Sequence, residues 1–213
     1  QIRSVELAMN NHVPIRVRST FSDDPGTLVR AEDEDLERLV VRGVTHSRSD
    51  IKLTLRHVVD RPGIAAKVFS ALAAAAINVD VIVQNMSESG TTDLSFTVAK
   101  TDRLSAEEIV RAIAPEVGAK SVEVDSNIAK ISIIGVGMRS YAGVAAAMFE
   151  ALAEAKINIQ MITTSEIRVT CVVDAAQTEK AVQVLHRKFD LHRGGVIAPK
   201  EQKRKSRPKR KHG

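Results

Sequence analysis

The sequence has 213 residues, of which 44% are hydrophobic and only 3% are aromatic, with no tryptophan. This length suits one large domain or two small ones, and the apolar content is sufficient for a core. So few aromatic residues argue against a surface that stacks nucleic-acid bases. The net charge of +5 comes from the C-terminal end, where residues 200–213 contain eight Lys or Arg and one Glu, so the remainder carries −2.

Cys171 is the only cysteine, which excludes an internal disulfide, and the apolar run 169–173 around it predicts a buried thiol. No signal peptide is visible. No apolar run is long enough to cross a membrane, because the longest, residues 64–83, is interrupted by Lys67, Asn78 and Asp80. These features predict a cytoplasmic protein without a membrane partner.

The first 49 residues differ in composition from the rest of the chain. Residues 2–9 predict a short amphipathic helix, residues 13–18 a strand and residues 21–26 a turn. Elements this short cannot bury a core, so we expect them to end a larger domain or to dock on the rest. The acidic segment 32–37 predicts a solvated linker.

Two later stretches, residues 63–82 and 143–162, repeat each other without gaps at an offset of 80 residues. Eleven of their twenty positions are identical, more than two unrelated helices of the same period would share. The repeat predicts a duplicated module of roughly eighty residues.

Each copy has the same order of expected elements, read from alternating and helical periodicity. The first has a strand over 51–59, a helix with Ile64, Val68, Phe69, Leu72 and Ala76 on one face, strands over 77–83 and 93–98, a helix over 105–115 and a strand over 119–124. The second has a strand over 129–136, a helix with Val144, Met148, Phe149, Leu152 and Lys156 on one face, strands over 157–163 and 167–173, and a helix over 174–188.

The order βαββαβ predicts an α+β fold of the ferredoxin-like type. We expect a four-stranded antiparallel sheet in each module, with both helices on one face. The other face and the sheet edges would then be available for pairing with another module.

The turn 60–63, Asp-Arg-Pro-Gly, is the most informative candidate for ligand binding. Pro62 fixes the backbone, Gly63 permits close approach, and the first amides of the next helix attract a carboxylate. Asp60 would hold an ammonium group beside them, so the pair suits an amino acid. The alternative is that Asp60 is only an N-cap or turn residue.

Three amides are further candidates. Asn78 and Asn158 begin the next expected strand in the two modules, where each either satisfies a turn or contacts a ligand between paired modules. Gln84 has the same two interpretations. Catalysis is not predicted, because the six histidines lack metal-ligand spacing and no glycine-rich phosphate loop is present.

These motifs together resemble the tandem ACT domains of aspartate kinases. The resemblance rests on residues 60–69, 77–80, 91–96, 130–138 and 164–168, and residues 3–27 resemble the last segment of the kinase domain. It implies a remnant of the kinase domain over 1–30, a linker and strand of the second ACT domain over 31–50, the first ACT domain over 51–126, the second over 127–193, and a basic disordered tail over 194–213.

The resemblance also implies a topology that the repeat does not reveal. A strand near residues 41–45 would belong to the second module, with the first module inserted between its parts. By motif position, the effector contacts would be Asp60, Arg61, Pro62, Gly63, Ile64, Ala65, Asn78, Val79, Asp80 and Gln84 in the first module, and Val144, Ala145, Asn158, Ile159, Ser165 and Glu166 in the second.

The implied function is feedback control by lysine, threonine or both, in a homodimer paired through its ACT domains. The family's kinase domain binds ATP, Mg²⁺ and aspartate, and its motifs are not found in this sequence, so no cofactor is expected here. The second module has Ser140 to Gly143 where relatives have Pro before the Gly, and it lacks an acid matching Asp60. The two effector sites are therefore not expected to be equivalent.

Two rival interpretations remain from the sequence. The chain is either part of a complete aspartate kinase or a free-standing amino-acid-sensing module. In the second case the basic tail would contact nucleic acid through its charge, although a solvated tail without such a partner is favoured.

Overall fold

The computed structural model describes residues 2–29, 39–86, 90–135, 143–193 and 196–197. The expectations for the acidic segment 32–37, for residues 140–142 and for the tail after residue 197 lie outside these described ranges. Backbone contacts divide the chain into two units, residues 1–38 and residues 39–213.

The first unit contains the helix α1 (Ile2–Asn10) and a hairpin of β1 (Ile15–Val17) and β2 (Thr27–Val29). The helix and first strand were predicted, whereas β2 was not. Most large apolar side chains classified in this unit are exposed, including Phe21 at 99%, and none of them is buried. This agrees with the expectation that these residues cannot bury a core of their own.

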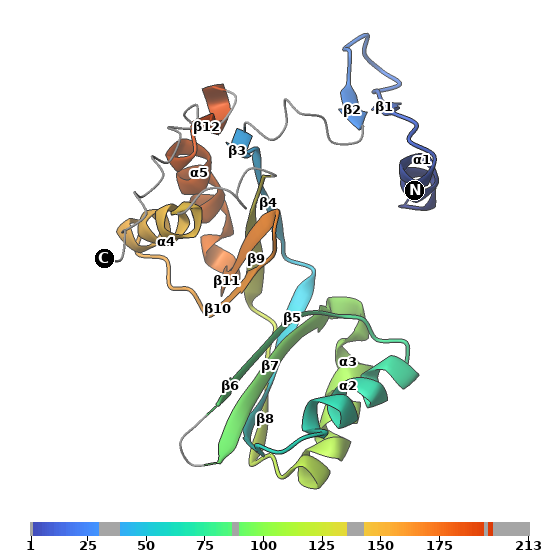
Figure 1. Ribbon diagram of the computed structural model, residues 1–213, viewed down its shortest axis with the longest axis vertical. Coiled ribbons are helices and arrows are strands. Elements are labelled where there is room, and N and C mark those ends of the chain that lie inside the picture. The colour runs from blue at the N-terminus through green and yellow to red at the C-terminus, as the bar shows by residue number, and fades with distance from the viewer. Residues whose placement is uncertain (1, 30–38, 87–89, 136–142, 194–195, 198–213) are drawn as a thin grey trace, which may run out of the picture. The chain divides into compact units, whose positions relative to one another are not determined.

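The first module of the second unit contains β5 (Asp50–Val59), α2 (Ile64–Ala74), β6 (Val79–Met86), β7 (Thr91–Ala99), α3 (Arg103–Ile113) and β8 (Ser121–Asp125). Its strands form one antiparallel sheet in the order β6-β7-β5-β8 (Figure 1). This is the predicted βαββαβ arrangement.

The second module contains β9 (Ile128–Ile134), α4 (Val144–Glu154), β10 (Met161–Thr164), β11 (Arg168–Asp174) and α5 (Thr178–Lys188). Its fourth strand is β4 (Gly43–Ser47), which pairs antiparallel with β9 and gives the sheet order β10-β11-β9-β4. The first module is therefore inserted between β4 and β9, as the family resemblance implied. Next to β4, the short strands β3 (Leu39–Val41) and β12 (Val196–Ile197) pair with each other.

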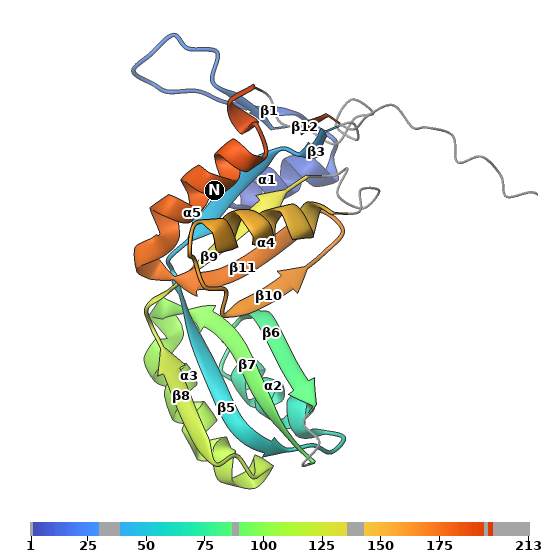
Figure 2. The same ribbon diagram turned by 90° about the vertical axis from the view of Figure 1, so that its left-hand side faces the viewer.

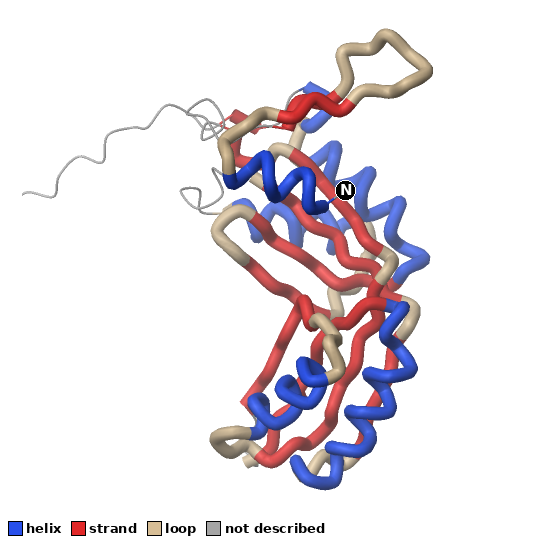
Figure 3. The backbone as a smooth tube through the Cα atoms, turned by 90° about the vertical axis from the view of Figure 1, so that its right-hand side faces the viewer, coloured by secondary structure: helices blue, strands red, loops and turns tan. Residues whose placement is uncertain are grey.

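In each module the two helices cover one face of the sheet, and no helix of the module's described residues lies on the other face (Figures 2 and 3). The core follows the strand alternation, with Ile51, Leu53 and Leu55 of β5 packed against Val68 and Leu72 of α2. A second core of the same kind lies beneath α4 and α5 and contains the buried thiol of Cys171. Burial raises the pKa of this thiol to about 12.

The repeat helices end earlier than predicted. Ala76 and Lys156, expected on the helix faces, lie beyond the helix ends in left-handed conformations with φ of 56° and 57°. The next amide, that of Ile77 or Ile157, returns to a carbonyl of the last turn at 3.0 and 2.9 Å. This Schellman arrangement closes the helix.

The same cap delays the next strand in each module. Residue 78 precedes β6 by one position, and β10 begins only at Met161, so the prediction that the Ile-Asn pairs start the strands is wrong. The backbone amides of Ile77 and Ile157 close a helix instead of joining a sheet. None of the helices in the described ranges is long and apolar enough to cross a membrane.

Candidate functional site

The turn 60–63 joins β5 to α2 and presents an open helix N-terminus. Gly63 is the N-cap, with φ of 93° and no side-chain cap, so the N-cap interpretation of Asp60 is wrong. The Asp60 side chain is exposed, and its carboxylate makes no hydrogen bond or ion pair with the described residues. The N–H of Ile64 reaches the Arg61 carbonyl only at 3.5 Å. The N-terminus of α2, which can bind an anion, therefore lies close in sequence to the carboxylate of Asp60.

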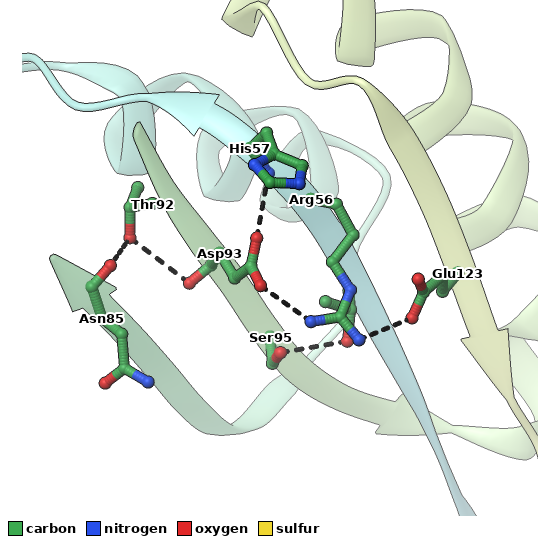
Figure 4. A network of polar contacts seen from close by, with 8 residues as sticks. Arg56, His57, Asn85, Thr92, Asp93, Ser95 and Glu123 are labelled. Carbon is green, nitrogen blue, oxygen red and sulfur yellow. Dashed lines mark hydrogen bonds and ion pairs between the residues drawn. The ribbon is translucent and has the colours of Figure 1, made fainter. Parts of the chain in front are cut away.

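A β-bulge directly before this turn is held by a network of charges (Figure 4). Arg56 donates to Asp93 at 2.7 Å and to Glu123 at 2.8 Å, from the middle of three adjacent strands. The second oxygen of Asp93 accepts the backbone N–H of His57 at 2.9 Å, where φ is 54°. The network fixes the direction in which the chain enters the turn 60–63.

The ionisation of this network is determined by its hydrogen bonds. The backbone N–H of His57, followed by the Arg56 guanidinium, lowers the pKa of Asp93. The hydrogen bond from Arg56 lowers the pKa of Glu123, and the bonds to Glu123 and Asp93 raise the pKa of Arg56. All three groups are therefore charged at neutral pH.

The predicted effector residues of the first module do not form one cluster. Asp60 follows the end of β5, whereas Asn78 to Asp80 lie beside its beginning, because β6 runs parallel to β5 across β7. The ten residues of β5 span about 30 Å. In the second module, Asn158 and Ile159 are likewise at the sheet end opposite to Ser165 and Glu166.

Where the two modules meet, each sheet extends one lysine to the other. Lys52 of β5 donates to the side-chain oxygen of Gln160, and Lys130 of β9 donates to Asp80 at 2.5 Å. The two lysines occupy the same place in the strand register of their sheets, and Asp80 and Gln160 are one repeat offset apart. The contacts are thus reciprocal, as in an interface with twofold symmetry.

Lys130 is the better enclosed of the two lysines. Its side chain is 13% exposed and also contacts Asp50 at 2.9 Å, whose side chain is 14% exposed. Burial by itself lowers the pKa of Lys130, but the hydrogen bonds to Asp80 and Asp50 outweigh it, and the pKa is raised. A small apolar cluster beside it contains Val81, Ile128, Met161 and Val172.

A pocket of about 210 Å³ lies between β6 of the first module and the β10–β11 hairpin of the second. One carboxylate, one guanidinium and several hydroxyls line it, together with apolar surface. The principal lining residues are Asp80, Val81, Thr163, Ser165, Arg168 and Thr170. These groups complement an ammonium, a carboxylate and a hydroxyl, which suits a small polar amino acid.

Of the predicted effector residues, the structure thus brings together Asp80 of the first module and Ser165 of the second. Asn78, Gln84 and Asn158 are exposed, and their side chains make no hydrogen bond within the described part of the chain. The side chains of Ile64 and Val144 are buried in the cores, so only their backbone is available to a ligand.

Sequence reasoning missed Lys130, Arg168, Thr163 and Thr170. These residues alternate with core residues along strands that have no unusual sequence motif. Only the strand register shows that they lie on the helix-free face, near the contact between the two modules. Thr170 is 5% exposed and bonds to the hydroxyl of Ser132 at 2.7 Å. Among the described residues, no group of His, Cys, Asp and Glu side chains has the arrangement of a metal site.

Comparisons with known proteins agree with this architecture. Family models described as ACT domain match residues 53–116 and 131–189. Chains of aspartokinase alpha and beta subunits superpose with a TM-score of 0.67 at 44% identity, covering 71% of this chain and 99% of the other. The regulatory subunit of aspartate kinase from Thermus thermophilus gives 0.67 at 38% identity, covering 70% and 99%.

The chain belongs to the aspartokinase family. It is 49% identical over 193 residues to the aspartokinase of Pseudomonas aeruginosa, which covers 90% of this chain and 47% of that relative. The match and the two ACT domains identify it as the C-terminal regulatory part of an aspartokinase. It therefore spans about half the length of the curated relatives that it matches.

Proposed function

We propose that this regulatory part binds lysine, threonine or both, and that binding inhibits an aspartate kinase. The observation that carries the proposal is the pocket between the ACT modules, where Arg168 complements a carboxylate and Asp80, one oxygen of which accepts from Lys130, has its second oxygen for an ammonium group. The hydroxyls of Thr163 and Ser165 add polar contacts for a side chain.

The turn 60–63 is the second part of the proposal. Its open helix N-terminus and the Asp60 carboxylate would hold the backbone groups of an amino acid, whose side chain would extend toward a second ACT module. We propose a homodimer that pairs through these modules. Its support is the pair of exposed isoleucines, Ile82 and Ile162, at matching places on the edge strands β6 and β10.

The choice of effector rests on a relative. Aspartokinase III of Escherichia coli, in complex with lysine and aspartate in a T-state, has 27% identity and a TM-score of 0.66 to this chain. ATP, Mg²⁺ and aspartate would bind to a kinase domain, which would produce 4-phospho-L-aspartate. The effector inhibits only to the extent that it binds the inactive arrangement more tightly. A cytoplasmic location stays a prediction.

Calorimetry on this chain with lysine, threonine and their mixture tests effector binding directly. We expect saturable heat with at least one of them. Asp80→Asn and Asp60→Ala should separate the two locations, because removing an ammonium partner weakens binding by about tenfold.

Glu108→Gln is the matched control, since it removes an exposed carboxylate of α3 that makes no ion pair with the described residues. It should leave the affinity unchanged. Absence of heat with both amino acids, alone and together, would contradict the proposal. Unchanged affinity in both Asp60 and Asp80 variants would contradict the assigned locations.

A further inference from the structure

The outer surface of the second module has a groove of about 640 Å³ between α4 and α5. Its floor is small and apolar and is formed by Ala151, Ala155 and Val184. Four cations and one acid, Glu154, stand around this floor. The cations are Lys156, Lys180, Arg187 and Lys188.

Within the described ranges, most of these cations have no carboxylate partner. Lys188 lies 3.5 Å from Glu150, and the Arg187 side chain donates only to the carbonyl of Gln183, at 3.4 Å. Lys156 and Lys180 make no hydrogen bond or ion pair with any described residue. Among the described residues, the positive charge of the groove is therefore only partly neutralised.

The first module provides an internal comparison. Its helix α3 corresponds to α5 at an offset of 75 residues, and α2 corresponds to α4 at an offset of 80. All four cationic positions of the second module are uncharged in the first. The counterparts of Lys156, Lys180, Arg187 and Lys188 are Ala76, Ser105, Ala112 and Ile113.

Helix stability does not account for all of these charges. Cations near a helix C-terminus, such as Arg187, Lys188 and Lys156, interact favourably with the helix dipole. Lys180 is in the first turn of α5, where the dipole disfavours a cation. The ACT fold does not require the set either, because the first module forms without it.

We propose that this groove binds an acidic segment of a partner protein, with acidic side chains at both ends and an apolar side chain between them. Lys180 and Arg187 are separated by about 10 Å along α5, which is two helical turns. A single phosphate group reaches only one of these ends, whereas two acidic residues on a helical segment reach both. The apolar floor receives the side chain between them.

Fluorescence anisotropy with a labelled helical peptide tests this binding. The peptide carries two Glu residues two turns apart and a Leu midway between them. The variant Lys180→Gln with Arg187→Gln should weaken binding by about tenfold, because the cations that pair with the two Glu residues at the two ends of the groove are lost. Replacing the Leu of the peptide by Gln should weaken it as well.

The matched control is Lys100→Gln with Lys120→Gln, which removes two exposed lysines of the first module. It keeps the same net charge as the groove variant and should change the affinity by less than about twofold. Circular dichroism of both variants checks that they fold. Equal weakening by the two variants would overturn the proposal, as would binding that does not depend on the Leu. Inorganic pyrophosphate that displaces the peptide at equal concentration would overturn it too.

Discussion

The two ACT modules share a fold, but they place opposite charges at matched positions of their sheets. By strand register Asp93 of the first module corresponds to Arg168 of the second. Asp93 accepts hydrogen bonds from Arg56 and His57 of its own sheet and so holds the bulge before the turn 60–63. Arg168 instead lines the pocket between the modules. Duplication therefore preserved the packing of the core, whereas the helix-free faces diverged.

The two modules also differ in the path of the chain. The first module is continuous from β5 to β8, whereas the second takes its fourth strand, β4, from before the insertion. The second module therefore folds only when segments on either side of the first one meet. Its stability should depend on contacts that the first module does not have.

The largest expected effect concerns β3, the short strand directly before that borrowed strand. A Cβ added at Gly135 would lie 2.1 Å from the carbonyl oxygen of Val40, so Gly135→Ala should destabilise the protein by about 3 kcal/mol. Gly43→Ala is the control, because a Cβ at Gly43 meets nothing within 4 Å. Urea unfolding measures both. Equal stability of the two variants would show that the close approach of Gly135 to β3 contributes little to the stability of the second module.

The reciprocal lysines provide the next test. Lys130→Met leaves Asp50 enclosed without its partner and should cost about 2 kcal/mol. Lys52→Met should cost less, about 1 kcal/mol, because Lys52 contacts the neutral Gln160 and reaches Asp125 only at 3.5 Å.

The Lys130 variant should also differ from the natural protein in alkaline solution. Because the pKa of Lys130 is raised, its stabilisation is complete below its unfolded pKa of about 10.4 and is lost as the pH rises through the folded value. Urea unfolding over this pH range should show that the free energy of unfolding falls more steeply with pH in the natural protein than in Lys130→Met. Identical pH profiles would contradict the proposed pairing.

The smallest effect is a gain at the helix caps. Ala76 and Lys156 adopt left-handed conformations that glycine tolerates better, so Ala76→Gly and Lys156→Gly should each stabilise by about 0.5–1 kcal/mol. Thermal unfolding measures both. If only one of the two variants lost stability, the side chain replaced in that module would make a contact that outweighs the backbone strain.

The sequence by itself determined the duplication, the order of elements and the core faces. These depend on local rules, since residues such as Ile51, Leu53 and Leu55 alternate on one strand and the repeat is visible in the residues. It also indicated the turn 60–63, because Pro restricts the backbone locally and Gly permits conformations that other residues avoid. Helix ends were misjudged at Ala76 and Lys156, since non-glycine residues there carry no cap signal.

Only the tertiary structure decided which distant residues meet. Asp60 and Asp80 were both assigned to the effector contacts of the first module, but Asp60 follows the end of β5, whereas Asp80 is on β6 near the level at which β5 begins, and β5 spans about 30 Å. Asp80 instead meets Lys130 and the pocket that Arg168 lines. Such pairings depend on strand register and on the packing of the two modules, and neither is encoded in the local pattern of the chain.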